Sequence, residues 1–283
     1  MSNLPERVYS SRSQLCTPGT MLKDMLADFV VSRGLAWRLL VRSIRSQYRQ
    51  TLLGYAWLLL PPLFTTAIWV YLNNSQILSV GRTDIPYPVY VLVGTLLWQS
   101  FTKSVGHPIQ QVQMNQSMIS KLNFPKEAII FASFGEMLFN CIIQMTVLVP
   151  VFIIFKVAVS PALLVAPLGI LAILAMGTTI GLLLVPVGSL YKDVVKALPL
   201  VLRAWFFLTP IVYPKPDSGV PALLASLNPV TPLVENTRGW LTGTETGDFI
   251  PFLGVVAVIL FFFVIGWITM RIAMPAIIER MNA

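Results

Sequence analysis

Long stretches without a charged residue constrain this chain more than any other feature. Residues 157–191 and residues 249–270 contain no Asp, Glu, Lys or Arg. A helix needs about 20 apolar residues to cross the hydrocarbon core of a bilayer, and every backbone polar group there must be bonded within the protein. Charged residues form only 11% of the chain, whereas a soluble domain has about 25%. The sequence therefore predicts an all-α integral membrane protein.

Six segments reach or approach the length of a span, and we predict six transmembrane helices. The first and the last are the clearest, whereas the fifth is short and carries Arg203. The second can continue as a helix toward Gln111, and the fourth has room for a turn at Ser160 and Pro161. The six segments are residues 52–72, 85–101, 128–155, 157–191, 198–213 and 249–270.

The distribution of Lys and Arg predicts which side of the membrane each connecting segment faces. Of the 20 Lys and Arg residues, fifteen fall in segments on the N-terminal side and four in segments on the opposite side, with Lys103 unassigned. Cytoplasmic segments of membrane proteins carry this excess. Both termini are therefore predicted to be cytoplasmic, and the net charge of +8 reflects orientation rather than binding to nucleic acid.

The segment before the first span has the pattern of an amphipathic helix. Apolar residues such as Trp37 and Val41 share one side at helical spacing, and arginines gather beside them. This pattern favours a helix lying in the membrane interface, although ordinary positive flanking of the first span explains the charges equally well. The arginines are Arg38, Arg42, Arg45 and Arg49.

The chain is expected to divide into four regions. Residues 1–20 are polar and are predicted to be a disordered cytoplasmic tail, and residues 21–51 form the interface helix. Residues 52–275 form the transmembrane domain, and residues 276–283 form a second cytoplasmic tail.

A hairpin is expected between the fifth and sixth spans. Its two apolar stretches, residues 220–227 and 232–241, are too short to cross a bilayer and are interrupted by Asn228-Pro229 and Gly239. Such segments either enter the membrane and return on the same side, where protein or water covers their backbone, or lie on the surface as a loop. We predict a re-entrant outer hairpin, with the surface loop as the alternative.

The chain lacks the residues that an enzyme would need. His107 is the only histidine, and no close pair of carboxylates or metal-binding motif occurs. No Gly-Lys dipeptide is present, so a phosphate-binding Walker loop is excluded and any ATP must be hydrolysed by another polypeptide. We therefore expect no metal and no cofactor in this chain, and we expect His107, beside Pro108, to be a satisfied residue at a helix end.

Polar residues form stripes on two of the predicted spans. Glu136, Asn140 and Gln144 recur every four residues, and a second stripe runs from Ser100 through Lys103 to Gln111. Residues with this spacing share one helix face, and polar residues inside a membrane mark functional sites by default. The stripes predict two walls of a hydrated path. The alternative is that they hydrogen-bond to each other between packed helices, with Lys103 neutralising Glu136.

Aromatic residues near the predicted span ends allow two interpretations. Most are typical of the aromatic belts at the membrane interface. A ring also offers a flat apolar face along which a sugar can slide. Trp98, Trp205 and Tyr213 are our candidates for such a glycan path.

Three motifs carry a resemblance to a known family. Residues 48–57 read YRQTLLGYAW and lead into the first span; Tyr191-Lys192-Asp193 follows the fourth span, and Asn228-Pro229 lies in the outer hairpin. With these motifs the chain resembles ABC exporter permeases of the polysaccharide-export type, which serve O-antigen, capsule and teichoic acid export. Lys192 stands where that family often has Arg. The motif positions singled out are Tyr48, Gly54, Trp57, Pro62, Tyr191, Asp193, Asn228 and Pro229.

The resemblance implies a transport subunit in the inner membrane of a bacterium, not an enzyme. Two copies would pair as a homodimer along a central path, and each would bind an ATPase subunit that holds ATP and Mg²⁺. The substrate would be a lipid-linked polysaccharide, whose phosphates would contact Arg42, Arg45 and Arg49. An exporter of small hydrophobic molecules or other lipids is the alternative, because it uses the same architecture. A secondary transporter is disfavoured because Glu136 is the one carboxylate within the predicted spans.

Overall fold

The computed structural model describes residues 18–49, 51–77, 80–121, 125, 127–158, 160–216 and 218–282. Within these residues all regular secondary structure is helical, which confirms the expected all-α class. The elements are α1 (Pro18–Tyr48), α2 (Ala56–Asn74), α3 (Tyr87–Met114), α4 (Gln116–Lys121), α5 (Glu127–Met145), α6 (Leu148–Ile154), the 3-10 helix η2 (Pro161–Leu164), α7 (Ala166–Leu190), α8 (Lys192–Leu208), α9 (Gly219–Leu227), α10 (Val230–Thr242) and α11 (Phe249–Asn282).

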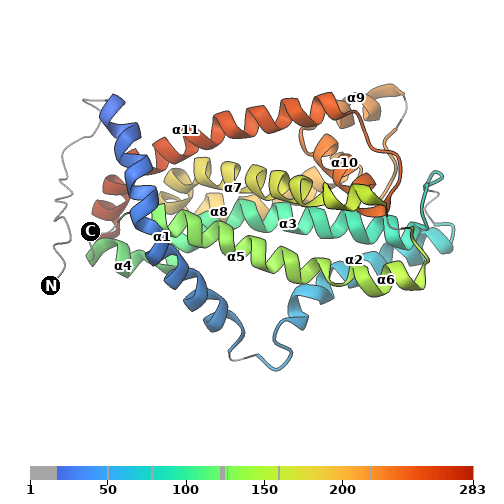
Figure 1. Ribbon diagram of the computed structural model, residues 1–283, viewed down its shortest axis with the longest axis horizontal. Coiled ribbons are helices and arrows are strands. Elements are labelled where there is room, and N and C mark those ends of the chain that lie inside the picture. The colour runs from blue at the N-terminus through green and yellow to red at the C-terminus, as the bar shows by residue number, and fades with distance from the viewer. Residues whose placement is uncertain are drawn as a thin grey trace.

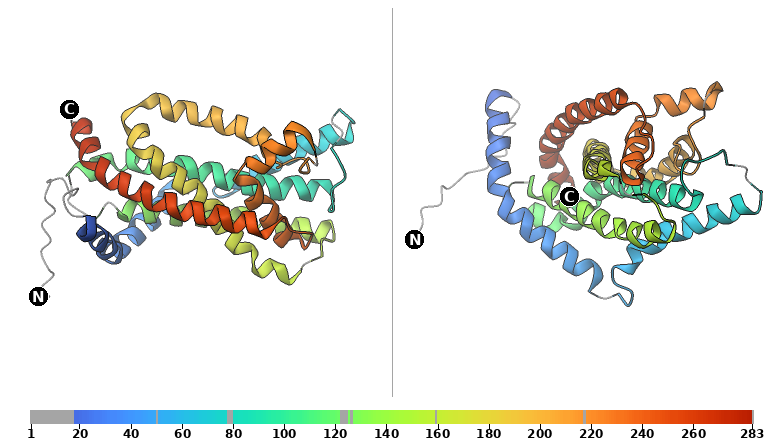
Figure 2. Two further views of the ribbon diagram at one scale, coloured as in Figure 1. Left: turned by 90° about the horizontal axis from the view of Figure 1, so that it is seen from above. Right: turned by 45° about the vertical axis from the view of Figure 1, so that its right-hand side comes forward.

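The long helices form one elongated bundle. Figure 1 shows α3, α5, α7, α8 and α11 running along its long axis, while α1 crosses the bundle obliquely. At one end of the bundle lie α4, the C-terminal part of α11 and the first half of α1, and we call this the α1 end (Figures 1 and 2). At the other end lie α6, α9 and α10, and we call it the α10 end (Figures 1 and 2).

Four helical segments of the described chain are long and apolar enough to cross a membrane: Ala56–Asn74, Glu127–Ile154, Ala166–Leu190 and Phe249–Arg280. The chain is therefore a multi-pass membrane protein by the length and composition of these helices. Polar residues interrupt α3, and α8 has only 17 residues, fewer than the roughly 20 that a span needs. The expected count of six spans remains a prediction.

The central helix of the bundle is α3, which packs most extensively on α7. Gly177 and Gly181 of α7 allow this close contact, because a Cβ atom at Gly177 would lie 2.6 Å from the backbone oxygen of Phe101. Small residues spaced four apart let helices approach closely in membranes. The Gly177-x-x-x-Gly181 spacing is the sequence signal for this contact.

Several helix boundaries differ from the expected ones. η2 precedes α7, and the Ser160 hydroxyl oxygen accepts a hydrogen bond from the Ala162 N–H at 3.3 Å. α11 continues through Pro275 to Asn282, so the residues assigned to a C-terminal tail are helical up to that point. Pro18–Thr20, assigned to the N-terminal tail, begin α1, and residues 1–17 lie outside the described residues.

The segment predicted as an outer hairpin forms α9 and α10 at the α10 end (Figure 2). Asn228 lies at their junction and anchors it. Its side-chain oxygen accepts hydrogen bonds from the Trp205 indole N–H at 3.0 Å and the Val230 N–H at 3.1 Å. Its amide nitrogen donates to the Thr209 hydroxyl at 2.7 Å. These bonds fix the helix pair to α8, while its re-entry into a membrane remains a prediction.

Candidate functional site

A cavity of about 830 Å³ lies between α3 and α8, with further walls from α1, α2 and α5. We call it the α3–α8 cavity. Its lining on α3 runs from Thr95 to Gln110 and on α8 from Val195 to Phe207. Protein sites for small ligands occupy about 300–1,000 Å³. The cavity is therefore large enough to hold one part of a longer ligand.

The charged side chains that line the α3–α8 cavity are Lys103 of α3 and Arg203 of α8, and none of its described lining residues is Asp or Glu. Cations without a neighbouring carboxylate in a cleft attract anionic ligands. The rings of Trp98, Phe206 and Phe207 line the same cavity. The site therefore combines positive charge with flat apolar faces.

The aromatic wall is a packed cluster. The Trp98 ring centroid lies 5.2 Å from that of Phe101 and 5.8 Å from that of Phe206. Trp205 packs edge-on against Phe101 at 5.5 Å, a geometry favoured by aromatic pairs. Among the described residues that line the cavity, Trp98 is present but Trp205 is not. Trp205 instead packs against Trp98 and Phe101.

Tyr213, the third aromatic candidate, also lies outside the α3–α8 cavity lining. It follows α8, and its hydroxyl donates a hydrogen bond to the backbone oxygen of Phe207 at 2.7 Å. Tyr213 therefore fixes the end of α8, and its predicted contact with a substrate has no geometric support here.

The residues of the polar stripe on α5 do not all have the same surroundings. The sequence left two interpretations open, the wall of a hydrated path and hydrogen bonds between packed helices. Asn140 lines the α3–α8 cavity. Gln144 is buried instead, where it donates to the Leu58 carbonyl at 3.1 Å and accepts from the Ser100 hydroxyl at 3.4 Å. Glu136 is buried as well and bonds to neighbouring helices. One member of the stripe thus faces the cavity, and two join helices together.

Glu136 is the centre of a buried hydrogen-bond network. Its Oε1 lies 3.2 Å from Nε2 of His107, and its Oε2 accepts from the Ser43 hydroxyl at 2.6 Å and from the Gln111 amide at 3.0 Å. Nδ1 of His107 lies 2.7 Å from the Ser133 hydroxyl. A buried carboxylate is costly unless it is paired and hydrogen-bonded, and this set of partners supplies those bonds.

The partner of Glu136 is His107. Lys103 was the neutralising residue only in the alternative interpretation of the two stripes, and His107 was expected at a helix end. In the structure both His107 and Pro108 lie inside α3, His107 pairs with Glu136, and Lys103 faces the α3–α8 cavity. Lys103 and His107 are one helical turn apart, so the register between α3 and α5 decides which of them meets Glu136, and a sequence does not give that register.

The network continues to α1. The side-chain oxygen of Gln111 accepts from the Asn115 amide at 3.0 Å, and the Asn115 oxygen accepts from the Arg42 guanidinium at 2.7 Å. Together with the bond from Ser43 to Glu136, this chain of contacts ties α1 to both α3 and α5. His107, which belongs to the network, also lines the α3–α8 cavity.

The four arginines predicted for the basic side of the interface helix line one groove on α1. The groove has a volume of about 500 Å³ and also includes Trp37, Val41 and Ser46. Trp37 is 66% exposed, so an apolar ring and several guanidinium groups share this surface. The arginines are Arg38, Arg42, Arg45 and Arg49.

The first family motif forms the junction between α1 and α2. Tyr48 is the last residue of α1, and Gly54 has a φ of +52°, a left-handed conformation that glycine adopts without steric cost. Trp57 is 56% exposed near the start of α2, whereas Pro62 is buried within that helix. This motif therefore sets the bend between the two helices.

The second motif forms the junction between α7 and α8. Tyr191 is extended between the two helices, and the guanidinium of Arg280 lies 5.5 Å from its ring centroid. Asp193 lies in the first turn of α8, where a negative charge interacts favourably with the helix dipole. In the third motif, Asn228 anchors the hairpin and Pro229 precedes α10.

Arg238 of α10 is a residue that the sequence analysis counted only for orientation. It is 5% exposed and donates to the carbonyl oxygens of Pro210 and Ile211 at 3.2 and 2.9 Å. Its guanidinium lies 3.8 Å from the ring centroid of Tyr90. A Cβ atom at Gly94 would lie 2.6 Å from this guanidinium. The sequence signal for this buried residue is an arginine within the stretch 232–241.

Comparisons with known proteins extend over most of the chain. The family model described as ABC-2 type transporter matches residues 35–242, from the middle of α1 to the end of α10. The match therefore includes the described walls of the α3–α8 cavity, the buried network from Arg42 to Glu136, and Arg238.

Similar proteins include permeases named for polysaccharide export. The O-antigen export system permease protein RfbA of Myxococcus xanthus is 24% identical over 230 residues, which cover 80% of this chain and 87% of that protein. RfbA of Klebsiella pneumoniae is 24% identical over 227 residues, covering 77% and 85%. The polysialic acid transport protein KpsM of Escherichia coli is 25% identical over 196 residues, covering 66% and 73%.

Proposed function

The chain belongs to the ABC-2 type transporter family, and from that premise we propose that it is the permease subunit of an ATP-driven exporter of lipid-linked polysaccharide. The observation that carries the proposal is the similarity over most of its length to permeases named for the export of O-antigen and the transport of polysialic acid. The α3–α8 cavity supports it, because its cations suit the phosphate of a lipid anchor and its rings suit flat apolar groups.

We propose that six helical segments cross the inner membrane of a bacterium: α2, α3, α5 with α6, α7, α8 and α11. The α1 end is then cytoplasmic and the α10 end faces outward. The position of the C-terminal part of α11 at the same end of the bundle as α1 supports this topology (Figure 1), as does the excess of Lys and Arg in the segments assigned to the cytoplasm. In this topology α1 lies in the interface, and α9 with α10 forms a re-entrant hairpin.

Transport requires an energy source and a second wall for the path. We propose that two copies of this chain pair with their α3–α8 cavities toward a shared path, and that two ATPase subunits bind the cytoplasmic side and hold ATP and Mg²⁺. In this arrangement Lys103 and Arg203 contact the anionic group of the substrate. Trp98, Phe206 and Phe207 contact its sugar or lipid part.

The buried network offers a route from the ATPase to the path. α1 lies at the proposed cytoplasmic end, and its Arg42 and Ser43 bond to residues that hold Glu136 and His107. Because His107 also lines the α3–α8 cavity, a movement of α1 changes the wall of the path. The groove on α1 that carries Arg45 and Arg49 is the proposed first contact for the substrate phosphates.

Deletion and complementation in the native host test the function. We expect deletion to remove surface polysaccharide and to leave lipid-linked polymer inside the cell, and we expect the wild-type chain to restore export. Unchanged surface polysaccharide in the deletion strain contradicts the proposal.

The purified permease–ATPase complex tests the substrate class. We expect the lipid-linked polymer to stimulate its ATP hydrolysis. Stimulation by small hydrophobic compounds, with none by the polymer, would favour the alternative exporter of hydrophobic molecules.

A further inference from the structure

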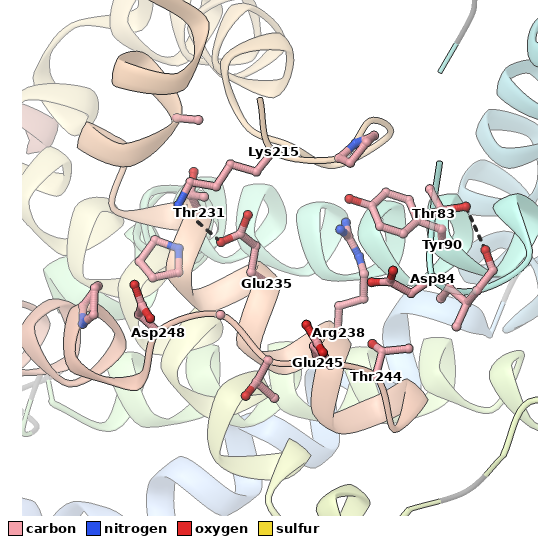
Figure 3. Close-up of a pocket in the computed structure, with 18 of the residues that line it drawn as sticks. Thr83, Asp84, Tyr90, Lys215, Thr231, Glu235, Arg238, Thr244, Glu245 and Asp248 are labelled. Carbon is pink, nitrogen blue, oxygen red and sulfur yellow. Dashed lines mark hydrogen bonds and ion pairs between the residues drawn. The ribbon is translucent and has the colours of Figure 1, made fainter. Parts of the chain in front are cut away.

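A second cavity, of about 560 Å³, lies at the α10 end and is unused by the proposed path. We call it the α10 pocket. Four parts of the chain line it: the segment before α3, the segment after α8, the α9–α10 pair, and the segment between α10 and α11. Figure 3 shows its labelled polar side chains arranged around a shared space, with Glu235 and Arg238 contributed by α10.

The α10 pocket has an excess of carboxylates. Lys215 pairs with Glu235 at 3.9 Å. One nitrogen of the Arg238 guanidinium, Nη2, donates to two carbonyl oxygens, and the group lies over the Tyr90 ring. Arg82 is the remaining cation of its described lining. The carboxylates are Asp84, Glu235, Glu245 and Asp248.

Two buried polar atoms of this lining lack a partner. The Thr231 hydroxyl and the Nε of Arg238 make no hydrogen bond with any described residue, and the two residues are only 1% and 5% exposed. A buried polar group without a partner is costly. The two atoms themselves have almost no exposed surface, so the groups that a ligand in the pocket can reach are other lining side chains, such as those of Thr244 and Glu235.

The mixture of groups indicates the chemistry of that ligand. Carboxylates accept hydrogen bonds, Lys215 and Arg238 donate them, and the threonine hydroxyls do both. Sugar hydroxyls also donate and accept. A bound metal ion fits less well, because no group of three or more His, Cys, Asp or Glu within the described residues is arranged to hold one.

We propose that the α10 pocket is a saccharide-binding site that selects neutral or amino sugars over acidic ones. The inference rests on the proposed function and deepens it, because a site at the outward-facing end would contact sugar units of the polymer as they leave the path. Selection follows from charge, since the carboxylates repel an anionic sugar. The chain would then handle a polymer unlike polysialic acid, despite its similarity to a polysialic acid transport protein.

The test is saturation-transfer NMR on the permease–ATPase complex in lipid nanodiscs. The neutral probes are methyl α-D-mannoside, methyl β-D-galactoside and methyl N-acetyl-β-D-glucosaminide, and the acidic probe is the methyl glycoside of N-acetylneuraminic acid. We expect at least one neutral probe to bind and the acidic probe not to bind. Thr244→Val and Glu235→Gln change two lining residues and should each raise the Kd of the neutral probe about fivefold, the effect of one lost hydrogen bond.

Matched controls lie outside the pocket. Thr146→Val and Glu279→Gln change exposed residues that do not line it, and both should bind like the wild type. A double charge reversal, Asp84→Lys with Asp248→Lys, should admit the acidic probe. This gain of binding does not depend on a variant losing activity, so poor folding cannot imitate it.

The outcomes separate this inference from the proposed function. Binding of no neutral probe, equal binding of the acidic probe, or equal binding by the pocket variants and their controls each overturns the saccharide site. The saccharide site is also overturned, in favour of a cation site, if calcium chloride displaces the neutral probes from the wild type and displaces them less from Glu235→Gln, which has one carboxylate fewer. If polysaccharide export depends on the chain while the saccharide site fails, the proposed function stands alone.

Discussion

The α3–α8 cavity and the α10 pocket differ in charge although one chain builds both. The first is lined by Lys103 and Arg203 and, among its described residues, by no carboxylate. The second is lined by four carboxylates, and its most buried cation, Arg238, donates two hydrogen bonds to backbone oxygens through Nη2. This difference in charge is the basis of the two proposed roles, contact with the anionic anchor of a substrate in the first cavity and with its uncharged sugars in the second.

The largest effect is expected at Glu136, a carboxylate that is buried between helices and does not line the α3–α8 cavity. Glu136→Ala leaves His107, Ser43 and Gln111 without their shared partner, and breaking a buried pair costs about 3–5 kcal/mol. We expect a large drop in the thermal unfolding temperature of the purified complex. Glu279→Ala, at an exposed position, is the control, and an equal effect of both changes contradicts the role of the network.

A smaller loss is expected at the wall of the α10 pocket. Gly94→Ala places a Cβ atom against the Arg238 guanidinium and the Ile211 backbone, and overpacking of this kind costs about 1–3 kcal/mol. Gly254→Ala is the control, because nothing lies within 4 Å of its Cβ position. Thermal unfolding of the two variants makes the comparison. Equal stability would show that Arg238 is not held as tightly as its contacts imply.

Charge reversal in the α3–α8 cavity tests the contrast directly. Lys103→Glu gives this cavity the carboxylate that it lacks, and we expect export of surface polysaccharide to fall about tenfold, equivalent to ~1.4 kcal/mol. Lys103→Arg should retain most export. Lys156→Glu changes an exposed lysine outside the cavity lining and should leave export unchanged. Wild-type export by Lys103→Glu removes the proposed contact with an anionic group.

The smallest effect concerns pH at the α10 pocket. Burial, together with Asp248, raises the pKa of Glu235, although Lys215 and Arg238 act in the opposite direction. The carboxylate accepts hydrogen bonds above that pKa, so binding of a neutral glycoside should weaken as the pH falls through it, by about threefold. NMR titration measures the change, and Glu235→Gln should lack this step. A profile shared by both proteins assigns the titration to another group.

The family and the fold class were accessible from the sequence. Uncharged segments predicted an all-α membrane protein, and the all-helical structure confirms that class. The motif around Gly54 and Trp57 led to the correct family. Both signals are local, because a span is recognised by consecutive residues and a motif by its spacing.

The composition of the candidate site was only partly accessible. Lys103 and Asn140 line the α3–α8 cavity as their polar stripes suggested, and Trp98 lines it as an aromatic candidate. Glu136 and Gln144, in contrast, are buried between helices. Asn140 shares its i, i+4 spacing with Glu136 and Gln144, so a helical pattern cannot separate a residue that faces a cavity from one that faces another helix. Packing of α5 against α3 separates them.

The sequence by itself determined the solvent of this protein, since a chain with such long uncharged segments is stable only when lipid or other helices surround it. Tertiary structure alone decided how its charges are paired. His107 rather than Lys103 meets Glu136 because of the register between α3 and α5. Arg238 is buried because α10 packs against α3 at Gly94. Pairing depends on distances between residues far apart in the chain, and those distances exist only after the helices have packed.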